Sequence, residues 1–274
     1  MASRVTRISF TKMHGLGNDF VIVDGRYDPV PRLSQSARIG LADRHTGIGC
    51  DQLILLEPSE TADLQMRIFN PDGEEVGACG NAARAVGLLA GEPVRIETAG
   101  GIIHAEPNER GIAVDMGEPR FGWEDVPLAY AMDTLLMPVG WKELQNPAAV
   151  NVGNPHVVFF LEDVEAVPLH HLGPLIERDP LFPERVNVNV AQATGPNSLK
   201  LRVWERGAGL TRACGTGACA SAVAALRRRF VTSPVNVSLP GGDLEVAWNG
   251  SGPVTMRGPA AESFRGSFEL EAYG

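Results

Sequence analysis

Two stretches of this 274-residue chain read alike: Met66-Arg67-Ile68-Phe69-Asn70, followed by Ala78-Cys79-Gly80, and Leu201-Arg202-Val203-Trp204-Glu205, followed by Ala213-Cys214-Gly215. In both stretches apolar and polar residues alternate as in a half-buried strand, and a glycine-containing turn then leads to the cysteine. The spacing is the same, because 214 − 79 and 201 − 66 both equal 135. The chain is therefore predicted to contain an internal duplication.

The same register matches polar residues elsewhere in the chain, next to apolar runs that resemble strands. The matched pairs are Asn18/Asn154 at an offset of 136, and Gln52/Asn187, Asn70/Glu205 and Cys79/Cys214 at an offset of 135. Short strand–turn–helix units can look alike by chance, but a near-constant offset over four pairs favours duplication.

An alanine-rich helix is predicted after each cysteine, over about residues 80–90 and 215–229. Gly91 and Pro93 end the first helix, and three arginines suit the negative end of the second. Both helices are apolar on most sides, so we expect each to be buried inside a sheet. We expect two halves, residues 1–120 and 121–261, with residues 262–274 returning to the first half.

The composition is that of a globular protein, with 44% hydrophobic residues, 31 glycines and 20 prolines. This glycine and proline content favours short strands and turns over a helical bundle. The net charge of −9 argues against a nucleic-acid or anionic-membrane partner. No signal peptide and no run of the roughly 18–20 apolar residues that a membrane helix needs are visible, so we expect a cytoplasmic protein.

Neither a metal nor a cofactor is expected. The cysteines lack a CxxC spacing, and no paired histidines accompany them. Lysine occurs only at positions 12, 142 and 200, which argues against a pyridoxal phosphate enzyme. Neither a dinucleotide-binding glycine motif nor a P-loop is present.

A cysteine at the start of a helix suggests acid–base chemistry. The unpaired N–H groups and the helix dipole favour negative charge, so they lower the pKa of a thiol and attract a substrate carboxylate. One thiolate can then remove an α-proton while an opposite thiol protonates the other face, and the N–H donors stabilise the enediolate between these steps. We assign these roles to Cys79 and Cys214. Cys50 and Cys219 have no catalytic counterpart in the register and are expected to be buried hydrophobic residues.

Seven motifs follow one another along the chain: Phe10-Thr11-Lys12-Met13-His14-Gly15-Leu16-Gly17-Asn18-Asp19-Phe20, Gly47-Ile48-Gly49-Cys50-Asp51-Gln52, Arg67-Ile68-Phe69-Asn70-Pro71-Asp72-Gly73, Cys79-Gly80-Asn81, Gly153-Asn154-Pro155-His156, Glu205-Arg206-Gly207 and Ala213-Cys214-Gly215-Thr216-Gly217-Ala218-Cys219. With these motifs the chain resembles the diaminopimelate epimerase family over nearly its whole length. One departure is Ala82, where the family usually has a second glycine after the asparagine.

The resemblance implies an α+β fold of two pseudo-symmetric halves, each a mixed β-sheet wrapped around a central helix, with the active site in the cleft between them. It implies Cys79 and Cys214 as the acid/base pair, with His156 and Glu205 assisting the thiols. It also implies these substrate contacts: Asn18, Gln52, Asn70, Gly80, Asn81, Asn154, Asn187, Glu205, Arg206, Gly215 and Thr216. A homodimer is a further expectation from the resemblance.

The implied reaction interconverts LL- and meso-2,6-diaminopimelate, a diamino dicarboxylic acid of lysine and peptidoglycan-precursor biosynthesis. The nearest alternative is a proline or hydroxyproline racemase, whose substrate has no distal amino-acid end for Arg206 to bind. A thiol–disulfide redox protein using Cys79 and Cys214 and a non-enzymatic binding module are alternatives from other classes. The remaining histidines are interpreted as structural or surface residues: His14, His45, His104, His170 and His171.

Overall fold

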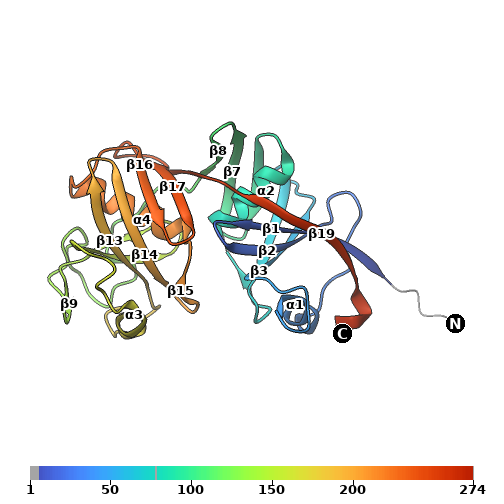
Figure 1. The fold of residues 1–274 in the computed structure, drawn as a ribbon, viewed down its shortest axis with the longest axis horizontal. Helices are drawn as coiled ribbons and strands as arrows, with labels where there is room; N and C mark the ends of the chain where they lie inside the picture. The colour runs from blue at the N-terminus through green and yellow to red at the C-terminus, as the bar shows by residue number, and fades with distance from the viewer. Residues whose placement is uncertain (1–5, 78, 274) are drawn as a thin grey trace. The chain divides into compact units, whose positions relative to one another are not determined.

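The computed structural model of the chain describes residues 6–77 and 79–273 (Figure 1). Its backbone divides into two compact units, Met1–Val114 with Pro259–Gly274, and Asp115–Gly258. Within the described ranges, no helix is both long and apolar enough to cross a membrane.

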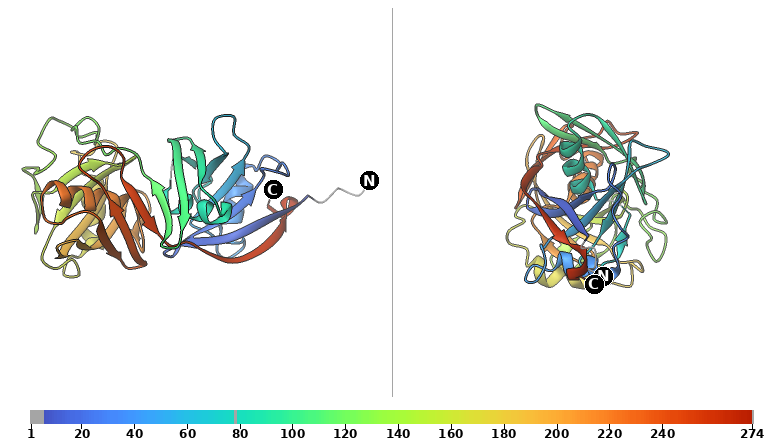
Figure 2. Two further views of the ribbon diagram at one scale, coloured as in Figure 1. Left: turned by 90° about the horizontal axis from the view of Figure 1, so that it is seen from above. Right: turned by 90° about the vertical axis from the view of Figure 1, so that its right-hand side faces the viewer.

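The first unit is a mixed sheet with helices. Its strands are β1 (Arg7–Gly15), β2 (Asn18–Asp24), β3 (Gln52–Glu57), β4 (Leu64–Phe69), β5 (Glu75–Val76), β6 (Val94–Thr98), β7 (Gly101–Asn108), β8 (Gly111–Asp115) and β19 (Ala261–Glu269). Its helices are α1 (Gln35–Ala42), α2 (Gly80–Ala90) and the 3-10 helix η1 (Leu270–Tyr273). Figure 2 shows β19, near the end of the chain, running beside β1, with which it pairs antiparallel.

The second unit contains its own mixed sheet. Its strands are β9 (Gly140–Trp141), β10 (Leu144–Gln145), β11 (Ala148–Asn151), β12 (Pro155–Phe160), β13 (Asn187–Gly195), β14 (Ser198–Glu205), β15 (Gly209–Thr211), β16 (Val235–Leu239), β17 (Gly242–Ala247) and β18 (Thr255–Gly258). Its helices are α3 (Leu169–Glu177) and α4 (Gly215–Arg227).

The two units repeat one topology. In the first, β2 pairs parallel with β3 and β4 parallel with β6, while β1–β2, β3–β4, β6–β7 and β7–β8 are antiparallel. Strands β11, β12, β13, β14, β16, β17 and β18 follow the same order and the same directions. The predicted pseudo-symmetry is confirmed.

Strand pairing also fixes which residues correspond between the units. Phe20 is opposite Gln52 in the β2–β3 ladder, and His156 is opposite Asn187 in the β12–β13 ladder. The offsets are 156 − 20 = 136 and 187 − 52 = 135, the two values found in the sequence.

Each sheet wraps around one alanine-rich helix. Helix α2 packs against β1, β6, β7 and β19, and α4 packs against β11, β12, β13, β14, β16 and β17. Almost every side chain of α4 is buried, and small side chains let strands approach it on several sides. Helix α2 ends at Gly91, whose φ of 73° is the left-handed conformation that glycine adopts without strain. The predicted mixed sheet around a central helix is thus confirmed in both units.

The opposite face of each sheet carries a second helix. Val21, Val23, Leu53 and Leu55 join a core cluster with residues of α1. Val157, Phe159, Val188 and Val190 form the corresponding cluster with residues of α3. Because side chains alternate along a strand, the residues between these apolar ones face the central helix.

Candidate active site

Each of the two predicted cysteines is the N-cap of a central helix. The sulfur of Cys79 accepts a hydrogen bond from the Ala82 amide at 3.4 Å, and that of Cys214 accepts one from the Gly217 amide at 3.4 Å. Both cap residues have extended backbone conformations, as N-caps require. Both sulfurs therefore lie at the positive end of a helix dipole. Ala78, which precedes Cys79 in the repeated motif, lies outside the described residues.

The pKa of the Cys214 thiol is raised, whereas the sequence led us to expect a lowered one. It is fully buried, and burial raises the pKa of its thiol well above the ordinary value. The neighbouring Glu205 carboxylate raises it further, while hydrogen bonds from Thr216 and Gly217 lower it. The expectation that the helix start would lower this pKa is wrong, because desolvation and a nearby negative charge outweigh the helix dipole. Cys214 is accordingly a neutral thiol at physiological pH.

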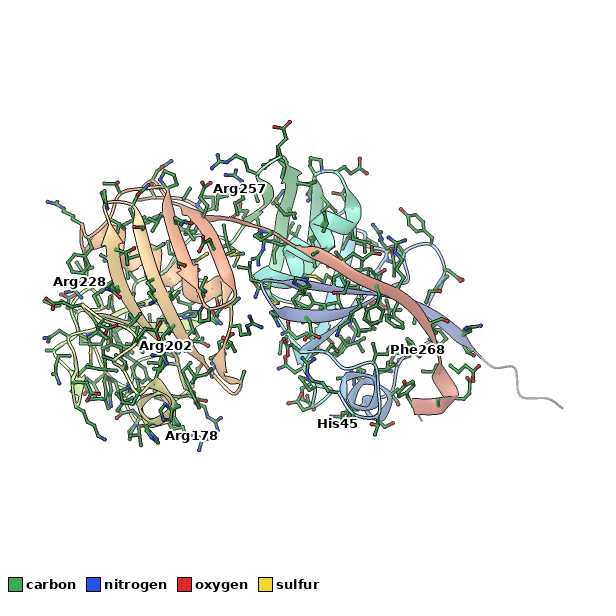
Figure 3. All side chains as sticks on the ribbon, in the orientation of Figure 1. His45, Arg178, Arg202, Arg228, Arg257 and Phe268 are labelled. Carbon is green, nitrogen blue, oxygen red and sulfur yellow. The ribbon has the colours of Figure 1, made fainter. Side chains whose placement is uncertain are left out.

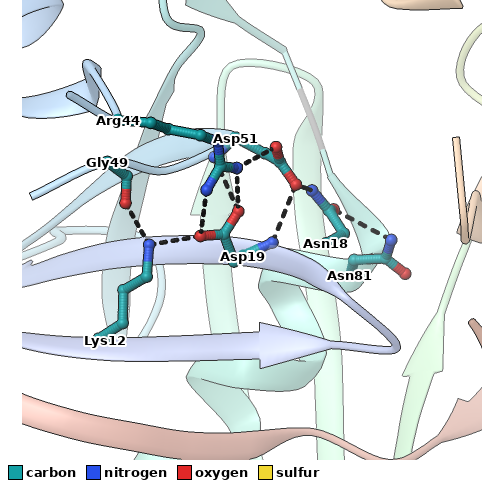
Figure 4. Close-up of polar contacts among 7 residues, drawn as sticks. All are labelled: Lys12, Asn18, Asp19, Arg44, Gly49, Asp51 and Asn81. Atoms are coloured by element: carbon teal, nitrogen blue, oxygen red, sulfur yellow. Dashed lines mark hydrogen bonds and ion pairs between the residues drawn. The ribbon is translucent and has the colours of Figure 1, made fainter.

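Asn18, the first residue of β2, connects to Cys79. Its amide nitrogen donates to Asp51 Oδ2 at 2.9 Å, and its Oδ1 accepts from Asn81 Nδ2 at 3.1 Å (Figure 4). The Cys79 sulfur lies 4.0 Å from the same oxygen. Asn18 therefore presents a hydrogen-bond acceptor toward the thiol.

An ion cluster holds Asp51 in place beside Asn18 (Figure 4). Arg44 bridges Asp19 and Asp51 at 2.6 Å to each, and Lys12 bonds to Asp19. Burial alone would raise the pKa of Asp19, but the hydrogen bonds and charges of Arg44 and Lys12 outweigh it and lower this pKa. Asp19 is thus held as a carboxylate.

Other predicted contacts of the first unit lie at the same end of the sheet. Gln52 begins β3, Asn70 follows the last residue of the antiparallel β4, and Gln52 Nε2 donates to Asn70 Oδ1 at 3.3 Å. Gly80 and Asn81 are buried in the first turn of α2, directly after Cys79. The duplication register had matched Asn18, Gln52 and Asn70 only by their spacing, and Asn81 was expected only from the resemblance. Hydrogen bonds now join Asn18 to Asn81 and Gln52 to Asn70.

In the second unit, a buried chain of side chains leads to Asn154. His156 Nε2 lies 2.9 Å from Asn154 Oδ1, and His156 Nδ1 lies 3.0 Å from Asn189 Nδ2. Burial lowers the pKa of His156 to about 3, and the positive charge of Arg206 acts in the same direction, against the hydrogen bond from Asn189. His156 is therefore neutral at physiological pH, with a hydrogen-bond partner at each ring nitrogen.

The side chain of Asn187 binds the backbone of Arg206, and both residues are predicted contacts. Asn187 is buried, accepts from the Arg206 amide at 2.9 Å and donates to the Pro155 carbonyl at 2.8 Å. The buried Glu177 carboxylate accepts from the Gly207 amide at 3.1 Å. These bonds hold the turn after β14, and they leave the Arg206 side chain exposed, with one guanidinium N–H donating to the Glu184 carbonyl at 2.9 Å.

Gly215 and Thr216 form the first turn of α4. Thr216 Oγ1 lies 3.5 Å from the Cys214 sulfur, so its hydroxyl can donate to a thiolate there. Glu205, the last residue of β14, interacts with the same sulfur. Cys214 is thus surrounded by one group that favours its thiol form and by donors that favour its thiolate.

Sequence reasoning did not single out Asn189 or Glu177. Asn189 stands in the run Asn187-Val188-Asn189-Val190, whose alternation is equally typical of a strand with one face in water. Both residues are buried, and each satisfies polar groups of residues that were predicted. Neither residue carried a distinguishing signal in the sequence, because Asn189 fits this ordinary alternation and Glu177 lies in α3, outside the motifs.

The remaining cysteines and histidines were not assigned to the site. Cys50 lies near the charges of Lys12, Asp19 and Asp51. Cys50 and Cys219 are both buried, and burial raises the pKa of Cys50 to about 11. None of the four cysteines forms a disulfide in the described part of the chain. His45, labelled in Figure 3, is an exposed residue of the first unit just after α1. Among the described residues, no group of three or more His, Cys, Asp or Glu side chains is placed to hold a metal ion.

Comparison with known proteins gives a family match over most of the chain. The family model described as diaminopimelate epimerase matches residues 10–122 and 148–262. The diaminopimelate epimerase of Erythrobacter litoralis is 63% identical over 267 residues, which cover 97% of this chain and 99% of that protein. The diaminopimelate epimerase of Sphingopyxis alaskensis is 59% identical over 265 residues, which cover 97% of this chain and 98% of that protein.

Solved structures extend the likeness to a wider group. A hydroxyproline epimerase from Agrobacterium vitis, solved with bound trans-4-hydroxy-L-proline, matches with a TM-score of 0.70 over 96% of this chain and 93% of that chain. Its sequence identity is 15%, so this likeness concerns the fold alone.

Proposed function

Because the chain belongs to the diaminopimelate epimerase family, we propose that it inverts one α-carbon of 2,6-diaminopimelate and so interconverts the LL and meso forms. This isomerase reaction belongs to lysine and peptidoglycan-precursor biosynthesis. The observation that carries the proposal is the pair of cysteines, each of which caps the central helix of its own unit.

We propose Cys79 and Cys214 as the acid/base pair. In one direction the Cys79 thiolate takes the α-proton, and the electron pair of the C–H bond moves into the carboxylate as an enediolate. The Cys214 thiol then delivers its proton to the opposite face, which leaves Cys79 as a thiol and Cys214 as a thiolate. The raised pKa of Cys214 supports its role as the proton donor in this direction. The reverse reaction exchanges the two roles.

Glu205 and His156 assist the thiols in this proposal. The Glu205 carboxylate adjoins Cys214 and keeps it protonated until the carbanion forms. The neutral His156 has both ring nitrogens hydrogen-bonded, so it assists through the groups that it holds.

The substrate contacts divide by chemistry. The N–H groups at the starts of α2 and α4 suit the carboxylate at the reacting centre, because a helix N-terminus favours an anion. Residues proposed there are Gly80, Asn81, Gly215 and Thr216. The distal carboxylate and amine suit a planar guanidinium and amides. Residues proposed for the distal end are Asn70, Asn154, Asn187 and Arg206. Asn18, Gln52 and Glu205 complete the set of contacts.

Chiral chromatography of LL-diaminopimelate after incubation with the protein tests this function. We expect meso-diaminopimelate to appear, and no product with the Cys79→Ala control. Racemised proline without any meso-diaminopimelate would instead favour a proline racemase, whose fold relatives include the hydroxyproline epimerase named above.

We further propose a cytoplasmic homodimer that needs no cofactor. An apolar surface on the first unit supports the dimer: Phe264 on β19 is 50% exposed, and with Phe10, Phe268 and Tyr273 it lines a groove of about 510 Å³. Light scattering during size exclusion measures the dimer, and a Phe264→Asp variant should shift it to the monomer. Activity that survives exhaustive dialysis against a chelator would support cofactor independence.

A further inference from the structure

A buried polar pair distinguishes the second unit from the first. His156 and Asn189 are fully buried, and both belong to the sheet face that meets α4. Strand pairing gives their counterparts in the first unit, since β2–β3 pairs Ile22 with Ile54 as β12–β13 pairs Val158 with Asn189. The counterparts are the apolar Phe20 and Ile54. Burial of polar groups costs free energy, and an apolar pair fills this place in the first unit, so packing alone does not account for the polar pair.

The backbone determines how the Asn189 amide is turned. Its nitrogen lies 3.0 Å from the Val157 carbonyl oxygen and 3.4 Å from the Asn187 carbonyl oxygen, and both oxygens can only accept. The group facing His156 Nδ1 is therefore an N–H donor, so Nδ1 must be the unprotonated ring nitrogen. A neutral imidazole carries its one proton on the other nitrogen, Nε2.

The proton on His156 Nε2 in turn orients Asn154. It is donated to Asn154 Oδ1 at 2.9 Å, which leaves the half-buried Asn154 side chain to present its amide nitrogen. That nitrogen has no hydrogen-bond partner among residues 6–77 and 79–273. Asn18, its counterpart, is turned the other way, because its nitrogen donates to Asp51. The duplicated asparagines thus present opposite polarity: Asn18 an acceptor and Asn154 a donor.

Gly217 provides the space that Asn189 needs. A Cβ at Gly217 would lie 2.8 Å from Asn189 Oδ1, closer than a real Cβ approaches any atom. The counterpart of Gly217 at the offset of 135 is Ala82. The unit with the buried Asn189 thus has a glycine at this helix position, and the unit with Ile54 has an alanine.

We propose that Asn189 is a positioning residue: by holding His156 in the Nε2–H tautomer it commits Asn154 to donating a hydrogen bond, and so to binding a carboxylate oxygen of the substrate. The inference rests on the proposed function for the identity of that substrate. The side chain of Asn189 is buried beneath the site, and it acts through His156 and Asn154.

The protonation of the two His156 ring nitrogens can be measured by NMR without any enzyme activity. In ¹⁵N-histidine-labelled protein at pH 6, we expect His156 to show a protonated Nε2 and an unprotonated Nδ1. In Asn189→Asp a carboxylate faces Nδ1, so the proton should move to Nδ1 and the two signals should exchange character. A wild-type ring protonated at Nδ1, or at both nitrogens, would overturn the proposal.

Kinetics then test the consequence for the substrate. We expect Asn189→Asp to raise KM for diaminopimelate about tenfold while kcat changes less than about twofold, as for a lost hydrogen bond to a charged group. The double variant His156→Phe/Asn189→Ile copies the apolar pair of the first unit. It should fold without the hydrogen bonds that orient Asn154, again with a raised KM. Val190→Ala, in the same strand but on the α3 side, is the control for destabilisation and should leave KM unchanged.

The outcomes separate the two proposals. An unchanged KM in the well-folded double variant would overturn the positioning role, even in an active enzyme. A wild-type chain that does not epimerise diaminopimelate would overturn the proposed function, whereas the ring protonation would still decide whether Asn189 sets the tautomer.

Discussion

The amide nitrogen of Gly217 donates to the sulfur of Cys214 at 3.4 Å, so the thiol proposed as an acid is also the cap of its own helix. Cys79 stands in the same relation to Ala82. One side chain thus has a structural and a chemical task, and substitutions can separate them.

Serine variants should retain the cap and lose the chemistry. We expect Cys79→Ser and Cys214→Ser to keep the unfolding free energy within about 0.5 kcal/mol, whereas the alanine variants lose about 1 kcal/mol. All four variants should lose inversion by at least about a hundredfold, because a hydroxyl is a poor acid and base at neutral pH. Urea unfolding and chiral chromatography measure the two effects. Inversion at a normal rate in either serine variant would count against the assigned roles.

Arg206→Lys keeps the charge and removes the planar fork. We expect kcat/KM for diaminopimelate to fall about tenfold or more, which corresponds to at least about 1.4 kcal/mol of transition-state binding. The Arg206 side chain is exposed, so the unfolding free energy should hardly change. An unchanged kcat/KM would mean that Arg206 does not contact the distal end of the substrate.

Oxidation distinguishes the epimerase from a redox protein. The proposed reaction needs both thiols reduced, so we expect a mild oxidant to abolish activity and dithiothreitol to restore it. Mass spectrometry after alkylation identifies the cysteines that were oxidised. A protein that is active only when oxidised, and that turns over against a reductant such as thioredoxin, would support the redox function instead.

Acid should destabilise the protein through His156. Its pKa is about 3 in the folded chain and about 6.5 when unfolded, so below pH 6.5 the unfolded state binds a proton that the folded state does not. The unfolding free energy should therefore fall as the pH falls, by up to about 2 kcal/mol from this residue between pH 6.5 and 5. The variant His156→Phe/Asn189→Ile lacks this group, and its unfolding free energy should depend less on pH in the same range. Equal slopes for the two proteins would contradict the assignment.

The duplication made much of the fold predictable. The offsets of 136 and 135 found in the sequence recur in the ladders, where Phe20 lies opposite Gln52 and His156 lies opposite Asn187. The predicted helices lie at Gly80–Ala90 and Gly215–Arg227. Such an offset works because both copies repeat the same strand lengths and turns. The polar residues at strand ends were therefore found by position, without knowledge of their contacts.

The sequence could not reveal the groups in which the copies differ. Asn189 has the apolar counterpart Ile54, so the comparison of the halves passes over it. Its burial depends on α4, which covers the strand from a distant part of the chain. The raised pKa of Cys214 likewise depends on the carboxylate of Glu205 and on burial, neither of which follows from a helix start alone.

The fate of the α-hydrogen in D₂O tests the two-base mechanism most directly. A thiol carries a single proton, so each face of the carbon has its own proton source. When LL-diaminopimelate is incubated in D₂O and the reaction is stopped early, the meso product should carry one deuterium at the inverted centre, because the donating thiol has exchanged with solvent. Recovered substrate should stay nearly unlabelled, since the captured hydrogen can return only to its original face while water is excluded. Mass spectrometry that instead found the original hydrogen in early product would contradict a reaction shared between Cys79 and Cys214.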